Sequence, residues 1–204
     1  VLHSFDSNDP AGRGPLGSLI LDAAGNLYGT TQGGGVSSGG TVFELTPKTG
    51  GDWGATVLHS FGAGKDGKGA TAPVLFDPAG NLYGTTYAGG AAKFGGTVFE
   101  LMPKEGGGWT ETVLHSFTTA DGAVPNSAVS RDAAGNLYGT TEYGGWDWGV
   151  VYKVDTAGGL TVLHSFSNGA DGGYPYGGVT PDAAGNLYGT TNSGGAGYAG
   201  IVYK

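Results

Sequence analysis

The chain contains no cysteine, which excludes a disulfide framework, a zinc–thiolate site and a cysteine nucleophile. Long hydrophobic runs are also missing, because no stretch approaches the ~18 apolar residues that a membrane span needs. Basic residues are few, since 9 Lys and Arg stand against 17 Asp and Glu, for a formal net charge of −8. We therefore expect no membrane span and no nucleic-acid partner, because binding to phosphate backbones depends on Lys and Arg.

Glycine, by contrast, is abundant. The 45 glycines and 9 prolines together make up about a quarter of the 204 residues, a level that without periodicity would indicate a disordered chain. Hydrophobic residues nevertheless amount to 38% and aromatic residues to 11%. This is enough apolar material to build a core, so the sequence predicts a folded protein.

The chain is built from four copies of one repeat. V-L-H-S-F begins at Val1, Val57, Val113 and Val162, and A-G-N-L-Y-G-T-T begins at Ala24, Ala79, Ala134 and Ala184. A third element, typified by G-T-V-F-E-L, begins at Gly40, Gly96, Gly149 and Gly200. The repeats lie near 1–56, 57–112, 113–161 and 162–204, and we expect residues 1–204 to form one domain.

Each repeat predicts four short strands. In the first repeat these are 19–21, 27–31, 41–45 and 56–61, which are rich in Val, Leu, Phe, Tyr and Thr and are interrupted by Gly or Pro. The segment 22–26, D-A-A-G-N, predicts a turn in which Asp22 accepts backbone N–H bonds. Tandem four-stranded units of about 50 residues are typical of propeller blades. The predicted fold is therefore all-β: a four-bladed β-propeller of four-stranded antiparallel blades.

The order of the elements favours a closed ring. The chain begins with a fourth strand, 1–5, and finishes with a third strand, 201–204, so the count closes when the N-terminal strand joins the last blade. A ring closed in this way favours a monomer. The alternative is that the four blades belong to a larger ring, which a second copy of the chain completes.

These motifs together resemble the GloVer repeat, a bacterial tandem repeat, over essentially the whole chain. The D-x-A-G-N-L-Y hairpin is also similar to the NHL and SMP-30-like propeller families. The resemblance implies a bacterial protein that is secreted or held at the cell surface, with a signal peptide and often a C-terminal sorting anchor. Neither segment is present in these residues, so we expect a mature or excised repeat domain. The resemblance implies no activity and no catalytic residues.

Residues that recur in every repeat are expected to be structural. His3, His59, His115 and His164 share one place in the fourth strand, and Asp22, Asp77, Asp132 and Asp182 open the turns. Functional alternatives are a metal or acid–base site for the histidines and calcium ligation for the turn aspartates. A group copied in every blade is more often structural than catalytic, so we favour packing between blades and turn formation. At one position of the third strand lie Glu44, Glu100, Lys153 and Lys204, which we interpret as solvated.

Variable residues gather in two sets of loops on one face of the predicted ring, which we call the loop face. One set joins consecutive repeats, at 6–15, 62–73, 118–125 and 167–175. The other set joins the second and third strands within a repeat, at 32–39, 87–95, 142–148 and 192–199. Loops on a rigid scaffold are where binding residues concentrate, so we place the candidate site here.

The loop face combines aromatic side chains with carboxylates and glycine. Flat apolar rings beside hydrogen-bond acceptors suit a sugar, although the rings could instead pack the loops together or cover the axis. The candidate ligand-binding residues are Tyr87, Phe94, Glu142, Tyr143, Trp146, Asp147, Trp148, Tyr174, Tyr176 and Tyr198.

Four aspartates in the loops between repeats raise the question of a metal. Asp9, Asp66, Asp121 and Asp171 each belong to such a loop, where Asp commonly forms turns. If the four carboxylates converged on the axis, calcium would be the expected ion. Because turn formation is the more common role, we expect no cofactor. The alternative is a bound calcium ion.

Three functions remain open from the sequence. The leading hypothesis is an extracellular, non-catalytic propeller that binds a glycan on its loop face. A carbohydrate-active enzyme is the first alternative, and its candidate catalytic residues are Glu142, Asp147 and Asp171, since two carboxylates suffice for glycoside hydrolysis. Asp121 is a further candidate carboxylate, and a lyase could use Lys93 or Arg13 as the neutralising cation. No P-loop, dinucleotide fingerprint, G-x-S-x-G or H-E-x-x-H motif occurs. The second alternative is a structural surface repeat or adhesin.

Overall fold

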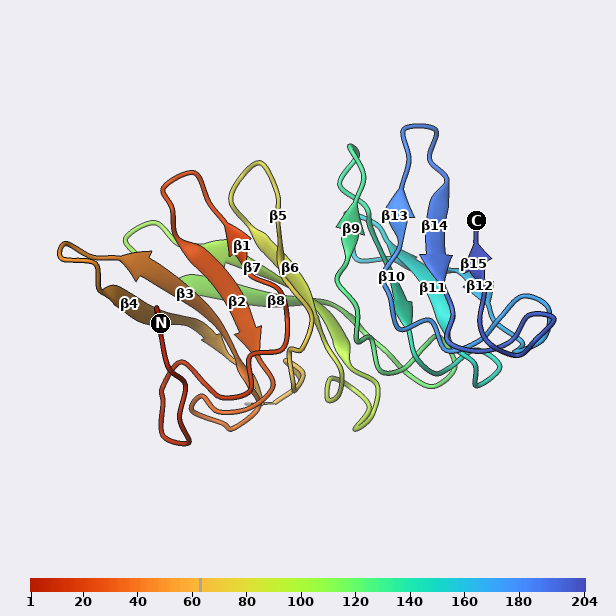
Figure 1. Ribbon diagram of the computed structural model, residues 1–204, viewed down its shortest axis with the longest axis horizontal. Coiled ribbons are helices and arrows are strands. Elements are labelled where there is room, and N and C mark those ends of the chain that lie inside the picture. Colours follow the sequence, from red (N-terminus) through yellow and green to blue (C-terminus); the bar gives the residue numbers. More distant parts are fainter. Residues whose placement is uncertain (63) are drawn as a thin grey trace.

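The computed structural model describes residues 1–62 and 64–204, and these residues form strands, turns and loops with no helix among them. Ala63, in the predicted loop 62–73, lies outside the described residues. The antiparallel sheets are arranged side by side as the four blades of a β-propeller (Figure 1). The predicted all-β, four-bladed architecture is therefore confirmed. Among the described residues there is no helix of the length and apolarity that crossing a membrane would require.

The first three blades contain four strands each and the last contains three. Within every blade, strands that are consecutive in sequence are neighbours in the sheet. The strands are β1 (Ile20–Leu21), β2 (Leu27–Thr31), β3 (Thr41–Pro47) and β4 (Trp53–Ser60) in blade 1; β5 (Leu75–Phe76), β6 (Leu82–Thr86), β7 (Thr97–Pro103) and β8 (Trp109–Ser116) in blade 2; β9 (Ser130–Arg131), β10 (Leu137–Thr141), β11 (Val150–Val154) and β12 (Leu160–Ser165) in blade 3; and β13 (Thr180–Pro181), β14 (Leu187–Thr190) and β15 (Val202–Tyr203) in blade 4.

The predicted turn between the first two strands of a repeat is confirmed. In blade 1, Asp22 Oδ1 accepts the backbone N–H groups of Ala24 at 2.9 Å and Asn26 at 2.8 Å. The Asn26 side chain and the Tyr28 hydroxyl both donate to the second carboxylate oxygen. The motif D-x-A-G-N-L-Y therefore forms a closed hydrogen-bonded unit at one end of each blade, and the same Asp–Asn–Tyr bonds recur in the other three blades.

The blades pack through an aromatic ring that directly follows the fourth strand of one blade and contacts the third strand of the next. Phe61 lies 4.9 Å from Phe99 between ring centroids, and Phe117 lies 4.9 Å from Tyr152. These rings belong to two apolar clusters, one between blades 1 and 2 and one between blades 2 and 3. A third cluster joins blades 3 and 4. The core is therefore a series of layers between neighbouring blades.

The predicted closure of the ring by the N-terminal strand is not found. Residues 1–5 form no strand, and β15 is hydrogen-bonded only to β14, so the last blade keeps three strands. The two termini lie at opposite ends of the molecule (Figure 1). The segment instead packs on its own blade, where Phe5 contacts Phe43. Each strand motif does occur four times in the sequence. This number does not determine which sheet edge the N-terminal segment reaches.

Candidate functional site on the loop face

The two sets of loops lie together, as predicted. In each blade one antiparallel bridge joins the loop that enters the blade to the loop between its second and third strands. The bridges are Arg13–Gly33, Lys68–Ala88, Ala123–Tyr143 and Gly173–Ser193. Because every loop is pinned to another by backbone hydrogen bonds, the side chains on this face are held on a fixed frame.

The most structured constellation on this face is centred on Glu142, which directly follows β10. Its side chain is only 9% exposed, yet it carries a carboxylate. The Asn126 side-chain amide donates to Oε2 at 2.9 Å, and the Tyr176 hydroxyl donates to Oε1 at 3.1 Å. Buried carboxylates require hydrogen-bond donors, and these come from blade 3 and from blade 4. Glu142 therefore links two blades at the loop face.

Aromatic rings surround this carboxylate. Tyr174 packs edge-on against Tyr143, with ring centroids 5.6 Å apart, and against Trp148 at 5.0 Å. The exposed fractions of Tyr143 and Tyr176 are 43% and 49%, so both offer ring surface to solvent. We refer to Asn126, Glu142, Tyr143, Trp148, Tyr174 and Tyr176 as the Glu142 cluster. The structure brings together five of the ten predicted ligand-binding residues in this cluster.

Two tyrosines of the Glu142 cluster, Tyr143 and Tyr176, have raised pKa values. Hydrogen bonding to Glu142 raises the pKa of both phenols, because the carboxylate accepts a hydrogen bond from the protonated phenol and its negative charge disfavours a phenolate. The cluster therefore presents a carboxylate acceptor, hydroxyl donors and partly exposed ring faces within a small area. This combination can accept and donate hydrogen bonds to hydroxyl groups while it stacks on an apolar face.

The local backbone explains how blade 4 supplies its rings. Tyr174 has φ of 55°, in the left-handed region where glycine is usual, and the same repeat position is Gly14 in blade 1 and Gly69 in blade 2. Its N–H donates to the carbonyl oxygen of Trp148 at 2.8 Å. A bulky ring thus occupies a turn position that is glycine in blades 1 and 2, and this fills the space above the junction of blades 3 and 4.

The remaining predicted aromatic residues lie outside this cluster. Tyr87 lines a separate pocket of about 410 Å³, together with Arg13, Lys68 and Gln32. Phe94 is exposed and lies beneath the Lys93 ammonium, 5.2 Å from its ring centroid. Trp146, Asp147 and Tyr198 are also exposed. No aromatic pair among the described residues includes Phe94, Trp146 or Tyr198.

The four loop aspartates do not converge on a common point. Each pairs instead with the histidine of its own repeat motif: Asp9 with His3 at 2.6 Å, Asp66 with His59 at 3.3 Å, Asp121 with His115 at 3.1 Å, and Asp171 with His164 at 3.1 Å. Residues 1–62 and 64–204 contain no group of three or more His, Asp or Glu side chains that could hold a metal ion. The alternative in which these four carboxylates converge on calcium is therefore contradicted by their separate histidine partners.

The candidate catalytic carboxylates also have different hydrogen-bond partners. Asp171 is occupied by His164 and by the backbone and hydroxyl of Ser167. Glu142 is occupied by Asn126 and Tyr176. Glu142, Asp147 and Asp171 share no hydrogen-bond partner among the described residues.

Sequence reasoning missed three features of the loop face. Asn126 was not selected, although it holds the carboxylate, because one amide in a variable loop carries no recognisable signal. The His–Asp pairs were also missed, and here a signal existed: each aspartate follows its histidine by six or seven residues in all four repeats. Arg13 and Lys68 line one pocket because blades 1 and 2 are neighbours. The spacing of the two residues in the sequence does not predict this.

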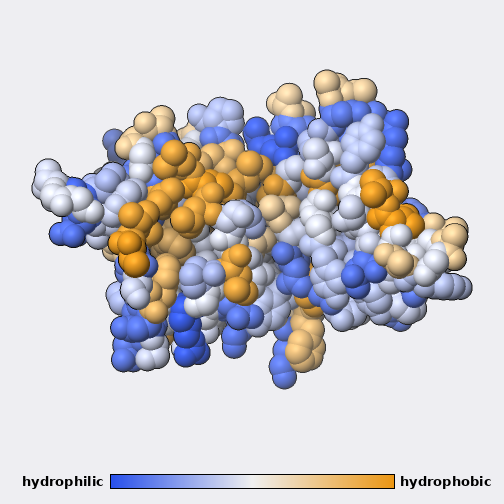
Figure 2. All heavy atoms as spheres, viewed as in Figure 1, coloured by the Kyte–Doolittle hydropathy of each residue, from blue (hydrophilic) through white to orange (hydrophobic). Residues whose placement is uncertain are grey.

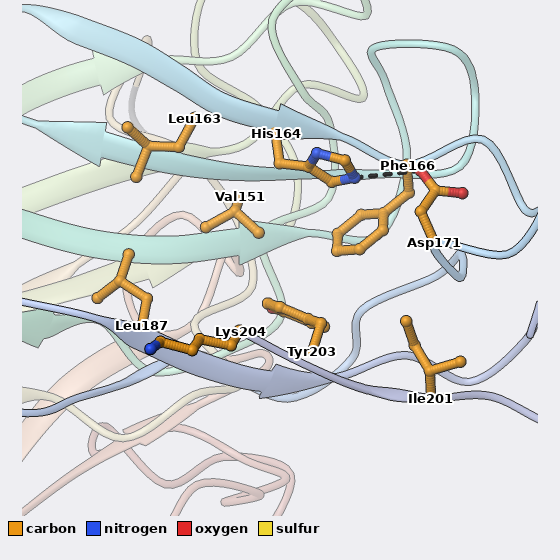
Figure 3. Close-up of a pocket in the computed structure, with 9 residues that line it drawn as sticks. All are labelled: Val151, Leu163, His164, Phe166, Asp171, Leu187, Ile201, Tyr203 and Lys204. Carbon is orange, nitrogen blue, oxygen red and sulfur yellow. Dashed lines mark hydrogen bonds and ion pairs between the residues drawn. The ribbon is translucent and has the colours of Figure 1, made fainter.

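A second concavity lies between blade 3 and the last strand. It has a volume of about 430 Å³ and is lined mainly by apolar side chains, including Leu163, Leu187 and Tyr203 (Figure 3). At the first junction the corresponding leucine, Leu58, packs in a cluster with Leu101 and Trp109. Strand β15 has two residues where β3 and β7 have seven, so this pocket marks the shortness of blade 4 rather than a shaped ligand site.

Comparison with known proteins supports the fold. An X-ray structure of a candidate gluconolactonase matches 91% of this chain at 20% sequence identity, with a TM-score of 0.51. The chain spans 59% of the length of that protein, so the likeness is to part of a larger fold. No curated protein matches the sequence. The family model of the Gloeobacter/Verrucomicrobia repeat matches residues 1–145 and 96–204, which together cover the whole chain. The chain therefore belongs to the Gloeobacter/Verrucomicrobia repeat family.

Proposed function

We propose that this protein is a non-catalytic, extracellular glycan-binding propeller, and that the Glu142 cluster is its principal binding site. The observation that carries the proposal is the buried Glu142 carboxylate, fixed by Asn126 and Tyr176 beside the partly exposed rings of Tyr143 and Tyr176. A sugar ring presents hydroxyls at its edge and C–H groups on its face, which are the two chemistries that this cluster offers.

The fixed geometry favours binding of a hydroxylated ligand. Glu142 is held by donors from two blades, so it loses little conformational freedom when a ligand hydroxyl approaches. Tyr143 and Tyr176 have only two side-chain torsions each, so they contribute contact area at a low entropic cost. The extracellular location follows the family resemblance and is part of the proposal.

Affinity electrophoresis in native gels tests the proposal. The wild-type chain is run through gels that contain a neutral plant β-glucan, alginate or pectate, and retardation is measured against glycan concentration. We expect retardation by at least one polysaccharide. For that polysaccharide, Tyr176→Ala should weaken binding about tenfold, because it removes a stacking ring and a hydrogen-bond donor. Tyr176→Phe keeps the ring and should weaken binding less.

Two matched controls keep this test specific. Tyr198→Ala removes an exposed ring outside the Glu142 cluster, and Asn192→Ala changes the exposed blade 4 residue that occupies the repeat position of Glu142. Both variants should bind like the wild type. If no polysaccharide retards the wild type, or if Tyr198→Ala weakens binding as much as Tyr176→Ala, the proposed site is wrong.

The same gels separate binding from catalysis. A zone of cleared polysaccharide around the band, abolished by Glu142→Gln, would replace the binding function with a carbohydrate-active enzyme. Asn126 and Tyr176 hold the Glu142 carboxylate in place as a hydrogen-bond acceptor, which is the role that the proposed binding function assigns to it. We therefore expect retardation without clearing.

A further inference from the structure

Blade 1 exposes a surface that is buried at every junction inside the molecule. Leu19 is 47% exposed, whereas the residues at the same repeat position, Val74, Val129 and Val179, are 3%, 5% and 5% exposed. Leu16 and Leu21, on either side of it, are 64% exposed. Figure 2 shows hydrophobic residues gathered over the β1–β3 side of the molecule. This surface, which we call the head, is the one that a preceding blade covers elsewhere.

Blade 4 exposes the complementary surface. Val202 in β15 is 79% exposed, whereas its counterparts Val42, Val98 and Val151 are at most 4% exposed. Tyr188 in β14 is 38% exposed, and its counterpart Tyr28 in blade 1 is 6% exposed. One edge of β15 has no hydrogen-bonded strand among the described residues. This surface, which we call the tail, is the one that a fourth strand and a following blade cover elsewhere.

A side-chain hydrogen bond crosses each internal junction in the same way. The threonine that is fourth in L-Y-G-T-T donates through Oγ1 to a backbone carbonyl of the next blade: Thr30 to Ala72 at 2.9 Å, Thr85 to Ser127 at 3.0 Å and Thr140 to Gly177 at 2.9 Å. The counterpart of these threonines in blade 4, Thr190, is exposed on the tail. The matching carbonyl, five residues before Asp22, is that of Gly17 on the head.

A backbone hydrogen bond repeats at the same junctions. Gly69 N–H donates to Gly39 O at 2.6 Å, Val124 N–H to Gly95 O at 2.9 Å, and Tyr174 N–H to Trp148 O at 2.8 Å. The corresponding donor on the head is Gly14, and the corresponding acceptor on the tail is Ala199. The head and the tail therefore carry the two halves of a junction that the chain already makes three times.

Residues 1–5 lie against the head as the end of a fourth strand does. Phe5 contacts Phe43 at 5.1 Å with an interplanar angle of 62°, close to the 5.1 Å and 63° of Phe166 and Tyr203 (Figure 3). His3 pairs with Asp9 as the other motif histidines pair with their aspartates. The segment thus already makes the contacts of a preceding blade's fourth strand, without a sheet to join.

We propose that a second copy of this chain adds its residues 1–5 to β15 as the fourth strand of blade 4, so that the head of one copy packs on the tail of another. The register follows from blade 1, where Phe43 pairs with Val57, Val42 with His59 and Thr41 with Ser60. By the same pattern Tyr203 pairs with Val1, Val202 with His3 and Ile201 with Ser4 of the second copy.

This contact is heterologous, because two different surfaces meet. Such contacts build closed rings when the rotation closes. Two copies would supply eight blades, which is within the usual propeller range of about four to eight, whereas three copies would exceed it. We therefore expect a dimer of twice 20.3 kDa with two identical junctions. The monomer expected from ring closure loses its basis, since the N-terminal segment does not close the ring within its own chain.

Engineered disulfides test both the contact and its register, because the chain has no cysteine of its own. The variant Ser4→Cys/Ile201→Cys places two thiols at directly opposed positions of the proposed strand pair, where the separation of the α-carbons suits a disulfide. After mild oxidation we expect a covalent dimer in non-reducing gels. The variant Ser4→Cys/Tyr203→Cys puts the thiols out of register and should cross-link at least tenfold more slowly.

Every outcome of this experiment is informative. A cross-linked dimer at micromolar concentration, formed much faster in register than out of register, supports the proposal. A disulfide within one chain shows that the N-terminal segment seals its own ring and overturns the proposal. Equal cross-linking in both registers, or none, also overturns it.

Sedimentation velocity of the chain without cysteine provides an independent measurement. We expect the wild type to sediment as a dimer. Leu19→Glu should shift it to a monomer by placing a charge in the junction, and the matched variant Phe94→Glu, at an exposed ring outside the junction, should remain dimeric. Circular dichroism of Leu19→Glu checks that the blades stay folded. A monomeric wild type over the whole concentration range contradicts the proposal.

Discussion

The ring of Phe99 lies directly over the α-carbon of Gly84, so that a β-carbon at this glycine would come within 2.5 Å of Phe99 Cζ. The same relationship holds between Gly29 and Phe43, where the approach would be 2.6 Å. The glycine of L-Y-G-T-T is therefore required because a third-strand aromatic ring occupies the space above the second strand.

Gly84→Ala should consequently destabilise the protein by about 1–3 kcal/mol, which is typical of overpacking in a well-filled core. The measurement is the free energy of unfolding from urea titration. Gly197→Ala is the matched control, since a β-carbon there would meet nothing within 4 Å and the residue is not in the left-handed region. Equal stability of Gly84→Ala and the wild type would show that Phe99 can move aside.

Because of Glu111, we expect the free energy of unfolding to fall as the pH rises above about 4.5. Burial of this half-buried side chain, together with the negative charge of Asp66, raises its pKa from 4.5 to about 7. The native state then binds more protons than the unfolded state between pH 4.5 and 7, so the free energy of unfolding declines across that window. Because half of the group is exposed, solvent screening reduces the expected loss to about 1 kcal/mol.

Replacement of this carboxyl by an amide tests the assignment. Glu111→Gln should remove the decline, so the stability difference between variant and wild type should grow from pH 4.5 to pH 8. Glu105→Gln, at a nearby exposed position, controls for the general change in net charge. A wild type whose stability does not fall relative to Glu111→Gln in this window contradicts the raised pKa.

For the turn aspartates we expect the opposite effect at low pH: the free energy of unfolding should fall as the pH falls. The hydrogen bond donated by the Asn136 side chain at 2.7 Å is the main cause that lowers the pKa of Asp132 from 3.8 to about 2. A carboxyl with a depressed native pKa stabilises the fold above its unfolded value, and this stabilisation is lost as pH falls from about 4 to about 2. In a titration followed by NMR, Asn136→Ala should move the Asp132 pKa upward toward 3.8, and Asn126→Ala should leave it in place.

Because of Arg13 and Lys68, we expect the protein to bind acidic glycans more tightly than neutral ones at low salt. Both cations line the pocket that contains Tyr87 and Gln32, and neither forms an ion pair among the described residues. The double variant Arg13→Gln/Lys68→Gln should weaken retardation by alginate or pectate about five- to tenfold at low salt, and binding of a neutral glucan should not change. High salt should weaken wild-type binding to the acidic polymers in the same way.

The charge-matched control uses lysines away from this face. Lys48→Gln/Lys104→Gln removes two positive charges from the hairpins between the third and fourth strands of blades 1 and 2. If this control loses as much affinity for the acidic polymers as the Arg13/Lys68 variant, net charge rather than the pocket determines the preference.

The sequence predicted the blades well, because the signals that define them are local. The segment 27–31 is a strand with the predicted bounds, and Asp22 closes the predicted turn through bonds to residues within four positions. The predicted strand 56–61 overlaps the second half of β4, which begins at Trp53 and ends at Ser60. Periodicity identifies strands, but their ends depend on the pairing partner.

The candidate site was predicted less completely because it is assembled across blades. Glu142, Tyr143, Trp148, Tyr174 and Tyr176 were identified from composition, yet their convergence depends on the junction between blades 3 and 4. Asp171 was interpreted as a turn residue, with an axial carboxylate ring as the alternative, and it pairs with His164. The third-strand residues Glu44 and Glu100 were interpreted as solvated, whereas each accepts a hydrogen bond from a tyrosine of its own blade. Contacts that depend on the relative placement of two elements leave no local trace in the sequence.

The offset between repeat and blade has an evolutionary consequence. The segment from one V-L-H-S-F to the next contains the fourth strand of one blade and the first three strands of the following one. Duplication of this segment therefore inserts one new sheet together with one new interface, and it leaves no additional strand edge exposed. Interactions of this nearest-neighbour kind make each unit nearly independent of the total number of units. Gene duplication in steps of 49 to 56 residues could thus lengthen or shorten such arrays without passing through an unfoldable intermediate.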